Sequence, residues 1–248
     1  MYLVCKENPY FEETGKLIRS AQEIGIWVYD EPIITDNFFL FGTRDFVLPH
    51  VDHDFHIFSR QEYLYDFSFL LSTNLTFHNI LNYFCDIVPA KRITQTINRR
   101  RTKTIFSFSY SGNKQFNGQV FSKATLQSNP AQFLQINPWE LVVLADDRGR
   151  PTKEYRFFFI RDNEDRIKYE CCEYIPEHSN DIPEEVKDFA EQNAKLIFDS
   201  IPFGNSFVLD ICELDECLWV LELNSWNSSG YYSIDPSKIL EMILWTNT

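Results

Sequence analysis

The sequence predicts a mixed fold of class α+β/α/β, in which a small α/β lobe is followed by a larger α+β region. Residues 2–29 have the order strand, helix, strand, which is typical of a small parallel α/β unit. From residue 104 onward, short β-rich runs alternate with turn residues, and helix patterns occupy 181–201 and 235–245. With 44% hydrophobic and 16% aromatic residues, the chain has the composition of an ordered globular protein.

Charge and cysteine content narrow the classes of function. The net charge of −13 opposes nucleic-acid binding, which depends on basic residues that release counterions from phosphate. No apolar stretch approaches the roughly 18 residues of a membrane span, and the first residues lack the basic and apolar regions of a signal peptide. The six cysteines form no CxxC and fit a reducing cytosol better than a disulfide framework. We therefore expect a cytoplasmic protein with neither membrane nor nucleic acid as a partner.

The first lobe begins with an apolar strand at 2–5. Asn8-Pro9 is a helix-start signal, and helically spaced apolar or small residues follow it up to Gly25, which ends the helix. A second strand is expected at 26–29, and further short strands at 38–42 and 45–48. No GxGxxG follows the first strand, so the lobe gives no indication of a dinucleotide site.

Histidines and aspartates gather directly after this lobe. His50, Asp52, Asp54 and His56 would share one side of a strand, which would suit a transition metal. Such clusters are also common in exposed connectors, and no tight turn presents these side chains. The connector is the favoured interpretation, with the metal site as the alternative.

The middle of the chain combines a basic island with a strand–loop–strand pattern. Arg99–Arg101 is either a solvated helix end or a landing place for phosphate or an acidic acceptor. Residues 104–110 alternate apolar and polar side chains as a strand does, and a second strand is expected at 119–121. The Gly/Ser/Asn loop between them carries Lys114, so it could close over a polyphosphate or be only a turn.

A charged pair enters the next apolar region. An apolar strand at 138–144 ends at an Asp-Asp-Arg-Gly turn, and a further strand is expected at 153–160. Glu154 and Arg156 lie two apart, so they project from one face of that strand. They are either neighbours at a sheet edge or part of a site, because charges that enter an aromatic run need a partner or a task. A long amphipathic helix is expected from Asp181-Ile182-Pro183 to the proline at 202.

The hairpin at 207–223 is the centre of the functional prediction. Glu222 and Asn224 project from one strand face, and a three-residue loop at 214–216 would place Asp210 opposite Val220, diagonal to Glu222 and on the same face. A one-residue register shift would turn Asp210 to the other side. Three oxygen-bearing side chains in an apolar sheet suit Mg²⁺, although a half-solvated acidic hairpin is the alternative. Asp235-Pro236 then begins a last helix, which runs to about residue 245.

Four motifs in a fixed order resemble an ATP-grasp enzyme. They are Lys114-x-Phe116-x-Gly118, Glu154-Tyr155-Arg156, Asp210, and Glu222-x-Asn224 followed by Ser229-Gly230-Tyr231. The order is similar to the phage- and bacteria-associated clade named for two arginines and one lysine. The resemblance implies two α+β lobes that sandwich ATP, preceded by a pre-ATP-grasp α/β lobe. It places that first lobe at 1–75 and the ATP-grasp domain at 76–248, divided into lobes at about 76–135 and 136–248.

The resemblance also implies an activity and a set of site residues. The clade is expected to contain ADP-forming carboxylate–amine ligases that activate an acid as an acyl phosphate with Mg-ATP and transfer it to an amine. The substrates would be ATP, an unidentified acid and an unidentified amine, with a peptide or a protein among the candidates. The resemblance implies that Lys114, with Gly118 in the same loop, contacts the ATP phosphates and that the adenine lies near Val142, Val143 and Leu144. It implies that Arg156 binds phosphate or the oxyanion and that Glu154 orients Arg156 or a metal-bound water. Two magnesium ions would be bound by Asp210, Glu222 and Asn224.

Two departures from the clade keep other functions open. The strand at 104–110 lacks the basic residue that many relatives carry there, and Lys103 is the nearest one. A second functional arginine has only Arg148 and Arg161 as candidates. A degenerate nucleotide-binding module and a non-enzymatic interaction protein are therefore the alternatives to a ligase.

Overall fold

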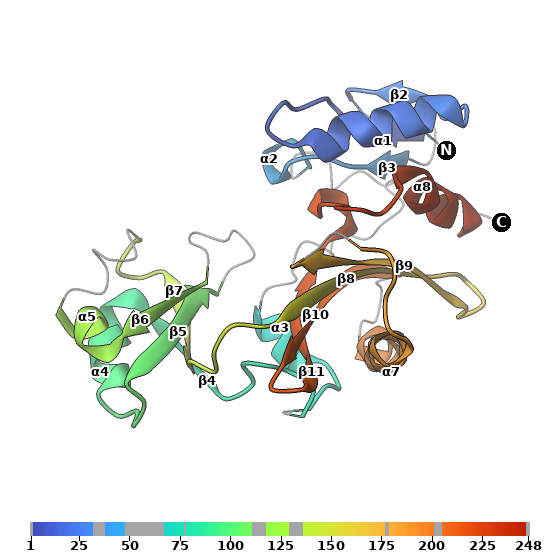
Figure 1. The fold of residues 1–248 in the computed structure, drawn as a ribbon. Helices are drawn as coiled ribbons and strands as arrows, with labels where there is room; N and C mark the ends of the chain where they lie inside the picture. Colours follow the sequence, from blue (N-terminus) through green and yellow to red (C-terminus); the bar gives the residue numbers. More distant parts are fainter. Residues whose placement is uncertain are drawn as a thin grey trace.

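Three sheets organise the chain (Figure 1). The computed structural model describes residues 2–31, 38–47, 67–76, 78–110, 118–128, 136–176, 179–200 and 205–246. The predicted Lys114 loop and the His50–His56 cluster lie outside the described residues. None of the helices in the described ranges has the length and apolarity that crossing a membrane requires.

The N-terminal sheet confirms the predicted strand–helix–strand unit. Strands β1 (Tyr2–Val4), β2 (Val28–Tyr29) and β3 (Phe38–Leu40) pair in parallel in the order β2-β1-β3. Helix α1 (Glu12–Glu23) begins after Phe11, a few residues later than the Asn8-Pro9 signal predicted. The strand predicted at 45–48 is wrong, because α2 (Arg44–Val47) forms a short helix there with a backbone bond from Val47 to Thr43.

The middle sheet is antiparallel and has the order β4-β7-β5-β6. Its strands are β4 (Cys85–Pro89), β5 (Thr104–Ser109), β6 (Gln119–Ser122) and β7 (Leu141–Asp146). The short helices η3 (Ala90–Arg92), α4 (Ile93–Ile97) and α5 (Lys123–Ser128) accompany them, and α4 and α5 supply core residues against β5 and β7. The alternation at 104–110 therefore correctly predicted a strand with one buried face.

The C-terminal sheet carries the predicted charged residues. It has the order β11-β10-β8-β9, built from β8 (Lys153–Arg161), β9 (Ile167–Ile175), β10 (Ser206–Leu214) and β11 (Cys217–Asn224). Helix α7 (Glu184–Ser200) packs on one face, and α3 (Phe67–Ser72) contributes Leu70 to the same core. The N-terminal sheet, α1 and α8 (Pro236–Trp245) lie over the other face (Figure 1).

Strand alternation separates the two faces of the C-terminal sheet. Tyr155, Phe157 and Phe159 of β8 pack with α7, whereas Phe158 and Ile160 pack under the N-terminal sheet and α8. Arg156 continues the second face along β8, and on β10 Asp210 follows the packed Val208 in the same way. The apolar half of this face holds the layers together, and the polar half next to it forms the candidate site.

A clasp after β11 joins the N-terminal and C-terminal sheets. In the short helix η4 (Trp226–Ser228), the Trp226 indole Nε1 donates to the carbonyl oxygens of Phe159 and Phe207, at 2.9 and 3.0 Å. The Asn227 amide donates to the Leu40 carbonyl, and the Gly42 N–H donates to the Asn227 carbonyl. This clasp fixes the segment that leads from β11 to the residues around Gly230.

Candidate functional site

The hairpin between β10 and β11 corrects the predicted register. The turn has two residues, Asp215 and Glu216, whose φ angles of 53° and 60° are those of a type I′ hairpin turn. A bulge between Asp210 and Ile211 then places Asp210 opposite Glu222, whereas the predicted three-residue loop placed it opposite Val220. The bulge offsets the shorter turn, so Asp210 and Glu222 still share a face.

Arg156 and Asp210 form a buried two-pronged ion pair at the centre of this face. The two residues pair across β8 and β10, and they are 7% and 0% exposed. Arg156 Nε donates to Asp210 Oδ1 and Nη2 donates to Oδ2, each at 2.7 Å. This bidentate geometry fixes the guanidinium plane relative to the strands.

Asn224 connects this ion pair to Glu222. Its amide Nδ2 donates to Asp210 Oδ2 at 3.1 Å and to Glu222 Oε1 at 3.0 Å. The three residues predicted as magnesium ligands therefore lie together on two neighbouring strands. Among the described residues, no group of three or more His, Cys, Asp or Glu is arranged to hold a metal ion, so the cluster depends on its asparagine.

Burial and the Arg156–Asp210 ion pair shift the pKa values of these two side chains in opposite directions. Burial raises the pKa of the Asp210 carboxyl, the guanidinium of Arg156 opposes that rise, and Glu222 adds to it. Burial by itself would lower the pKa of Arg156, but the charge and hydrogen bonds of Asp210 raise it, so the guanidinium stays protonated. The two carboxylates and the one guanidinium together leave a net negative charge when all are ionised.

Glu154 has a different partner from the one predicted. Its Oε2 accepts a 2.6 Å hydrogen bond from the Tyr174 hydroxyl, and the carboxylate that orients Arg156 is that of Asp210. Arg156 also donates from Nη1 to the carbonyl oxygen of Gly230 at 3.3 Å. β8 places Arg156 opposite Asp210, whereas Glu154 meets Tyr174 of β9, so Asp210 and not Glu154 is the partner of Arg156 here. Orientation of a metal-bound water by Glu154 stays a prediction.

Two tyrosines beside Arg156 escaped the sequence prediction. The rings of Tyr174 and Tyr232 stack with centroids 4.8 Å apart, and Arg156 lies 5.3 and 5.0 Å from those centroids. Burial, followed by the carboxylates of Asp210 and Glu154, raises the pKa of Tyr174, so its hydroxyl remains a donor. The position of Tyr232 directly after the Ser-Gly-Tyr motif was the only available signal, because β9 was not predicted.

The other predicted residues lie elsewhere in the fold. Val142, Val143 and Leu144 are fully buried in β7, whose backbone pairs with β4 and β5 on its two sides. Gly118 is exposed next to β6, where an added Cβ would lie 2.6 Å from the Phe106 ring, so a side chain there would have to displace that ring.

The arginine candidates have structural partners in the described chain. Arg148 lies over the Trp219 ring at 4.2 Å, and Arg161 pairs with Asp165 at 3.6 Å. From the basic island, Arg100 binds Asp86 and Asp146, each at 2.8 Å. These contacts stabilise the folded chain and do not bring a second arginine to Arg156.

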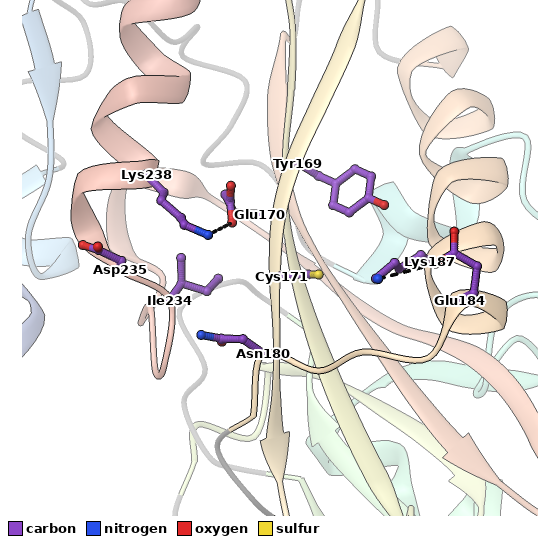
Figure 2. A pocket seen from close by; sticks show the side chains of 9 residues that line it. All are labelled: Tyr169, Glu170, Cys171, Asn180, Glu184, Lys187, Ile234, Asp235 and Lys238. Carbon is purple, nitrogen blue, oxygen red and sulfur yellow. Dashed lines mark hydrogen bonds and ion pairs between the residues drawn. The ribbon is translucent and has the colours of Figure 1, made fainter.

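A pocket of about 470 Å³ lies along β9, between the first turns of α7 and α8 (Figure 2). Four of its five charged side chains form two ion pairs: Lys238 with Glu170 and Lys187 with Glu184, each at 3.5 Å. None of the predicted site residues lines this pocket. The residues around Arg156 therefore remain the candidate site.

The fold is the ATP-grasp fold. Solved structures that share this fold include the D-cycloserine synthetase DcsG, with a TM-score of 0.66, 11% identity and coverage of 100% of this chain and 99% of that one. A RimK domain protein ATP-grasp from Sphaerobacter thermophilus has a TM-score of 0.68 and 11% identity, and the match covers 98% of each chain. The ATP-grasp ligase PsnB, complexed with a minimal precursor, has a TM-score of 0.60 and 11% identity, and the match covers 99% of this chain and 98% of that one. No curated protein sequence matches the chain.

The sequence itself specifies the family. An ATP-grasp domain family, the third of the clade named for two arginines and one lysine, matches residues 51–243. The chain belongs to this family, which confirms the predicted superfamily and fold and places the protein among ATP-dependent ligases at the level of the family.

Proposed function

We propose that the protein is an ADP-forming carboxylate–amine ligase. The observation that carries this proposal is the buried Arg156–Asp210 pair, joined through Asn224 to Glu222 on one face of the C-terminal sheet. Transfer of a phosphoryl group to a carboxylate needs alignment and neutralisation of charge more than it needs a protein nucleophile. A preorganised guanidinium would supply the alignment. Together with a cation bound by the two carboxylates, it would also neutralise the charge.

The donor set fits magnesium. Carboxylate and amide oxygens are hard ligands. Asp210 and Glu222 supply carboxylates, and Asn224, whose Nδ2 donates to both, would ligate through its Oδ1. These three residues would hold magnesium, which would supply positive charge against the charge of the ATP phosphates. Asp210 Oδ1 accepts one hydrogen bond, from Arg156 Nε, so it keeps a lone pair that could bind a cation while the guanidinium stays in place.

The reaction has two balanced steps. The substrate carboxylate takes the γ-phosphoryl group of ATP, which gives an acyl phosphate and ADP. The amine nitrogen then forms the amide bond, the bond from acyl carbon to phosphate oxygen breaks, and phosphate and a proton leave. Arg156 would hold the oxygens of the transferring group, and Glu154, oriented by Tyr174, would face the same reaction space.

The remaining assignments are part of the same proposal. Lys114, with Gly118 in its loop, would contact ATP phosphates, and the β7 region around Val142–Leu144 would lie near the adenine. Residues 1–75 would form the pre-ATP-grasp lobe and 76–248 the ATP-grasp domain, with a peptide or protein as substrate. The protein would work in the cytoplasm, the host cytoplasm if it is phage-encoded, where ATP is available and its six free cysteines stay reduced.

The direct test is an ATP-dependent screen. Protein, Mg-ATP and pools of carboxylic acids would be incubated with hydroxylamine, which traps an acyl phosphate as a hydroxamate. We expect acid-dependent ADP release together with hydroxamate, and a mass shift when lysate components replace the pools. ATP hydrolysis that no acid stimulates, in every pool and in lysate, would contradict the proposal.

A nucleotide-binding module without ligase chemistry is the second candidate. The observation that favours it is that both oxygens of Asp210 are engaged by Arg156, and β5 lacks a basic residue. Tight Mg-ATP binding with no ADP release in the same screen would identify this function.

A further inference from the structure

A bulge in β9 brings Tyr174 beside both charged residues that β8 places on the face of the candidate site. The pairing of β8 with β9 shifts between Glu154 and Tyr155, and Tyr174 is the residue of β9 that this shift leaves without a cross-strand partner. Its hydroxyl donates to Glu154 Oε2 at 2.6 Å, and its ring centroid lies 5.3 Å from Arg156 Cζ. One inserted side chain therefore connects Glu154 to the surroundings of Arg156.

Glu154 has one carboxylate oxygen that the described chain does not engage. Its Oε2 accepts from Tyr174, whereas Oε1 accepts no hydrogen bond from the residues that the structure describes. The donors of Arg156 go to Asp210 and to the carbonyl of Gly230, and no other lysine or arginine in the described ranges pairs with Glu154. Glu154 is only partly buried, so a substrate can reach it. An ionised carboxylate only accepts hydrogen bonds, so its ligand must bring an N–H or O–H group.

The order of the sheet separates this carboxylate from the predicted magnesium ligands. Arg156 pairs with Asp210 on β10, and the other two predicted ligands follow on β11, beyond β10. Glu154 turns the other way, toward Tyr174 on β9. A phosphoryl group held by Arg156 would therefore have the predicted cation on one side and Glu154 on the other. That second side is the one from which an amine would approach without meeting the cation.

The Tyr174 hydroxyl is suited to hold Glu154 in place throughout a reaction. Burial, followed by the carboxylates of Asp210 and Glu154, raises the pKa of Tyr174, so its hydroxyl remains a donor. Oε2 can accept this hydrogen bond whether Oε1 is ionised or protonated. The bond therefore fixes the direction of Oε1 before and after a proton reaches it.

We infer that Glu154 is the catalytic base that takes the proton of the acceptor amine, and that Tyr174 is a positioning residue that holds Glu154 for this step. The inference rests on the proposed ligase function and assigns its second step. The nitrogen of the neutral amine forms its bond to the acyl carbon and passes a proton to Glu154 Oε1. The bond from that carbon to the phosphate oxygen breaks, the proton passes to the departing phosphate, and Glu154 is ionised again.

Transient kinetics separates the two steps of the reaction. The full chain would be mixed rapidly with Mg-ATP and an acid found in the pool screen, and ADP would be followed without hydroxylamine. Hydroxamate would then be followed at low hydroxylamine concentration, where trapping in solution is slow. We expect Glu154→Gln, a nearly isosteric change, to keep the rate of the first ADP turnover within about twofold and to lower the hydroxamate rate about a hundredfold. Added formate, a small carboxylate base, should restore part of the hydroxamate rate in Glu154→Ala.

Tyr174→Phe tests the positioning role. We expect it to lower the hydroxamate rate about tenfold with an unchanged first turnover, and to have no further effect in the Glu154→Gln variant, because it acts through Glu154. A purely structural role would lower both rates or add to the loss in the double variant. Tyr169→Phe removes a hydroxyl from the same strand on the face toward α7, so it is the matched control and should leave both rates unchanged.

The outcomes that overturn the inference differ from those that overturn the ligase. A slower first turnover in Glu154→Gln would assign Glu154 to phosphoryl transfer, and a hydroxamate rate equal to the parent's would leave it without a role in either step. Additive losses in the double variant would remove Tyr174 from the mechanism. Absence of acid-dependent hydroxamate from the parent in every pool would contradict the ligase itself, and the base assigned to its second step with it.

Discussion

At Asp210, one buried carboxylate binds two neighbouring side chains at once. Both of its oxygens accept hydrogen bonds from Arg156, and Oδ2 also accepts one from the amide of Asn224. A buried charge persists in a protein only when it is paired, so each partner fixes the position of the other. The result is a guanidinium whose planar donors are aligned before any substrate binds, which suits a transferring phosphoryl group better than a mobile ammonium does.

Arg156→Lys should therefore separate catalysis from binding. A lysine keeps the charge but not the two-pronged contact, so we expect ADP formation to fall by about two orders of magnitude while Mg-ATP affinity changes little. Losing one hydrogen bond to a buried carboxylate should also lower the free energy of unfolding by about 1–3 kcal/mol. ADP release, nucleotide titration and denaturant unfolding on one preparation would measure all three quantities.

The control is Arg161→Lys, because Arg161 lies on the same strand as Arg156. Its Nη1 is 3.6 Å from Oδ1 of the exposed Asp165, so this ion pair is weak. It should leave ADP formation and stability close to the parent. Equal losses of affinity and turnover in Arg156→Lys would make Arg156 a binding residue, and loss of neither would make it structural.

Lys114→Ala addresses the loop between β5 and β6. A loop lysine contributes charge to phosphate and not to a core, so we expect Mg-ATP affinity to fall about tenfold or more with an unchanged unfolding midpoint. The matched variant is Lys103→Ala, at the exposed basic residue just before β5. An unchanged affinity in Lys114→Ala would make the loop a simple turn, and a larger loss in Lys103→Ala would move the phosphate contact there.

Among the elements, the β10–β11 hairpin shows how local geometry places a functional group. Its two-residue turn alone would set Asp210 opposite Leu221, with its side chain on the wrong face for Glu222. The bulge adds one residue to β11, so Val220 and Leu223, three apart, both face α7 while Glu222 faces Asp210. Turn and bulge together bring the carboxylates to one face.

Helix α8, which covers part of the same sheet, begins with a charge-dependent cap. The Asp235 carboxylate accepts the backbone N–H of Ser237 at 2.9 Å, and this bond is the main reason that the pKa of Asp235 is lowered. A lowered pKa means that the folded protein favours the ionised carboxylate. The contribution is therefore complete above the ordinary pKa of about 3.9 and is lost as the pH falls through the lowered value.

Asp235→Ala should lower the free energy of unfolding by about 1 kcal/mol at neutral pH, and this loss should shrink in acid. Asp235→Asn, which keeps a capping oxygen without a charge, should stay near the parent at neutral pH. Urea unfolding of the three proteins at several pH values would measure the difference. A loss in Asp235→Ala that is constant down to about pH 2 would show that the carboxylate charge plays no part.

On the scale of the whole molecule, the N-terminal sheet and the C-terminal sheet act as one support for the site. The clasp at η4 joins them, and α1 brings Glu13 to Gly230 beside the stacked tyrosines. This long-range contact places a residue of the N-terminal lobe next to the segment that follows β11.

Trp226→Phe should weaken that clasp. The indole N–H serves two carbonyl groups of the C-terminal sheet, and phenylalanine keeps most of the apolar contact without the donor. We expect the free energy of unfolding to fall by about 1–2 kcal/mol. Trp27→Phe, at a tryptophan that is 73% exposed, is the control and should have little effect. Equal effects of the two substitutions in a denaturant titration would contradict the role of the indole.

The sequence by itself determined the features that depend on local periodicity and composition. Alternation identified β5, and an aromatic and apolar run identified β8. The stripe on α7 follows helical spacing, with Val186, Ala190 and Ile197 buried as expected. The order of the motifs identified the ATP-grasp family, because Glu222-x-Asn224 and Asp210 are close in sequence on paired strands.

Only the tertiary structure decided which groups meet. Sequence spacing suggested Glu154 for Arg156, since residues two apart share a strand face, but the cross-strand neighbour Asp210 is the partner. The turn length, the bulge, and the stack between Tyr174 and Tyr232 arise from pairing between segments far apart in the chain. A single sequence records no such pairing, because the energy of a cross-strand contact depends on register, which the packing of both sheet faces sets.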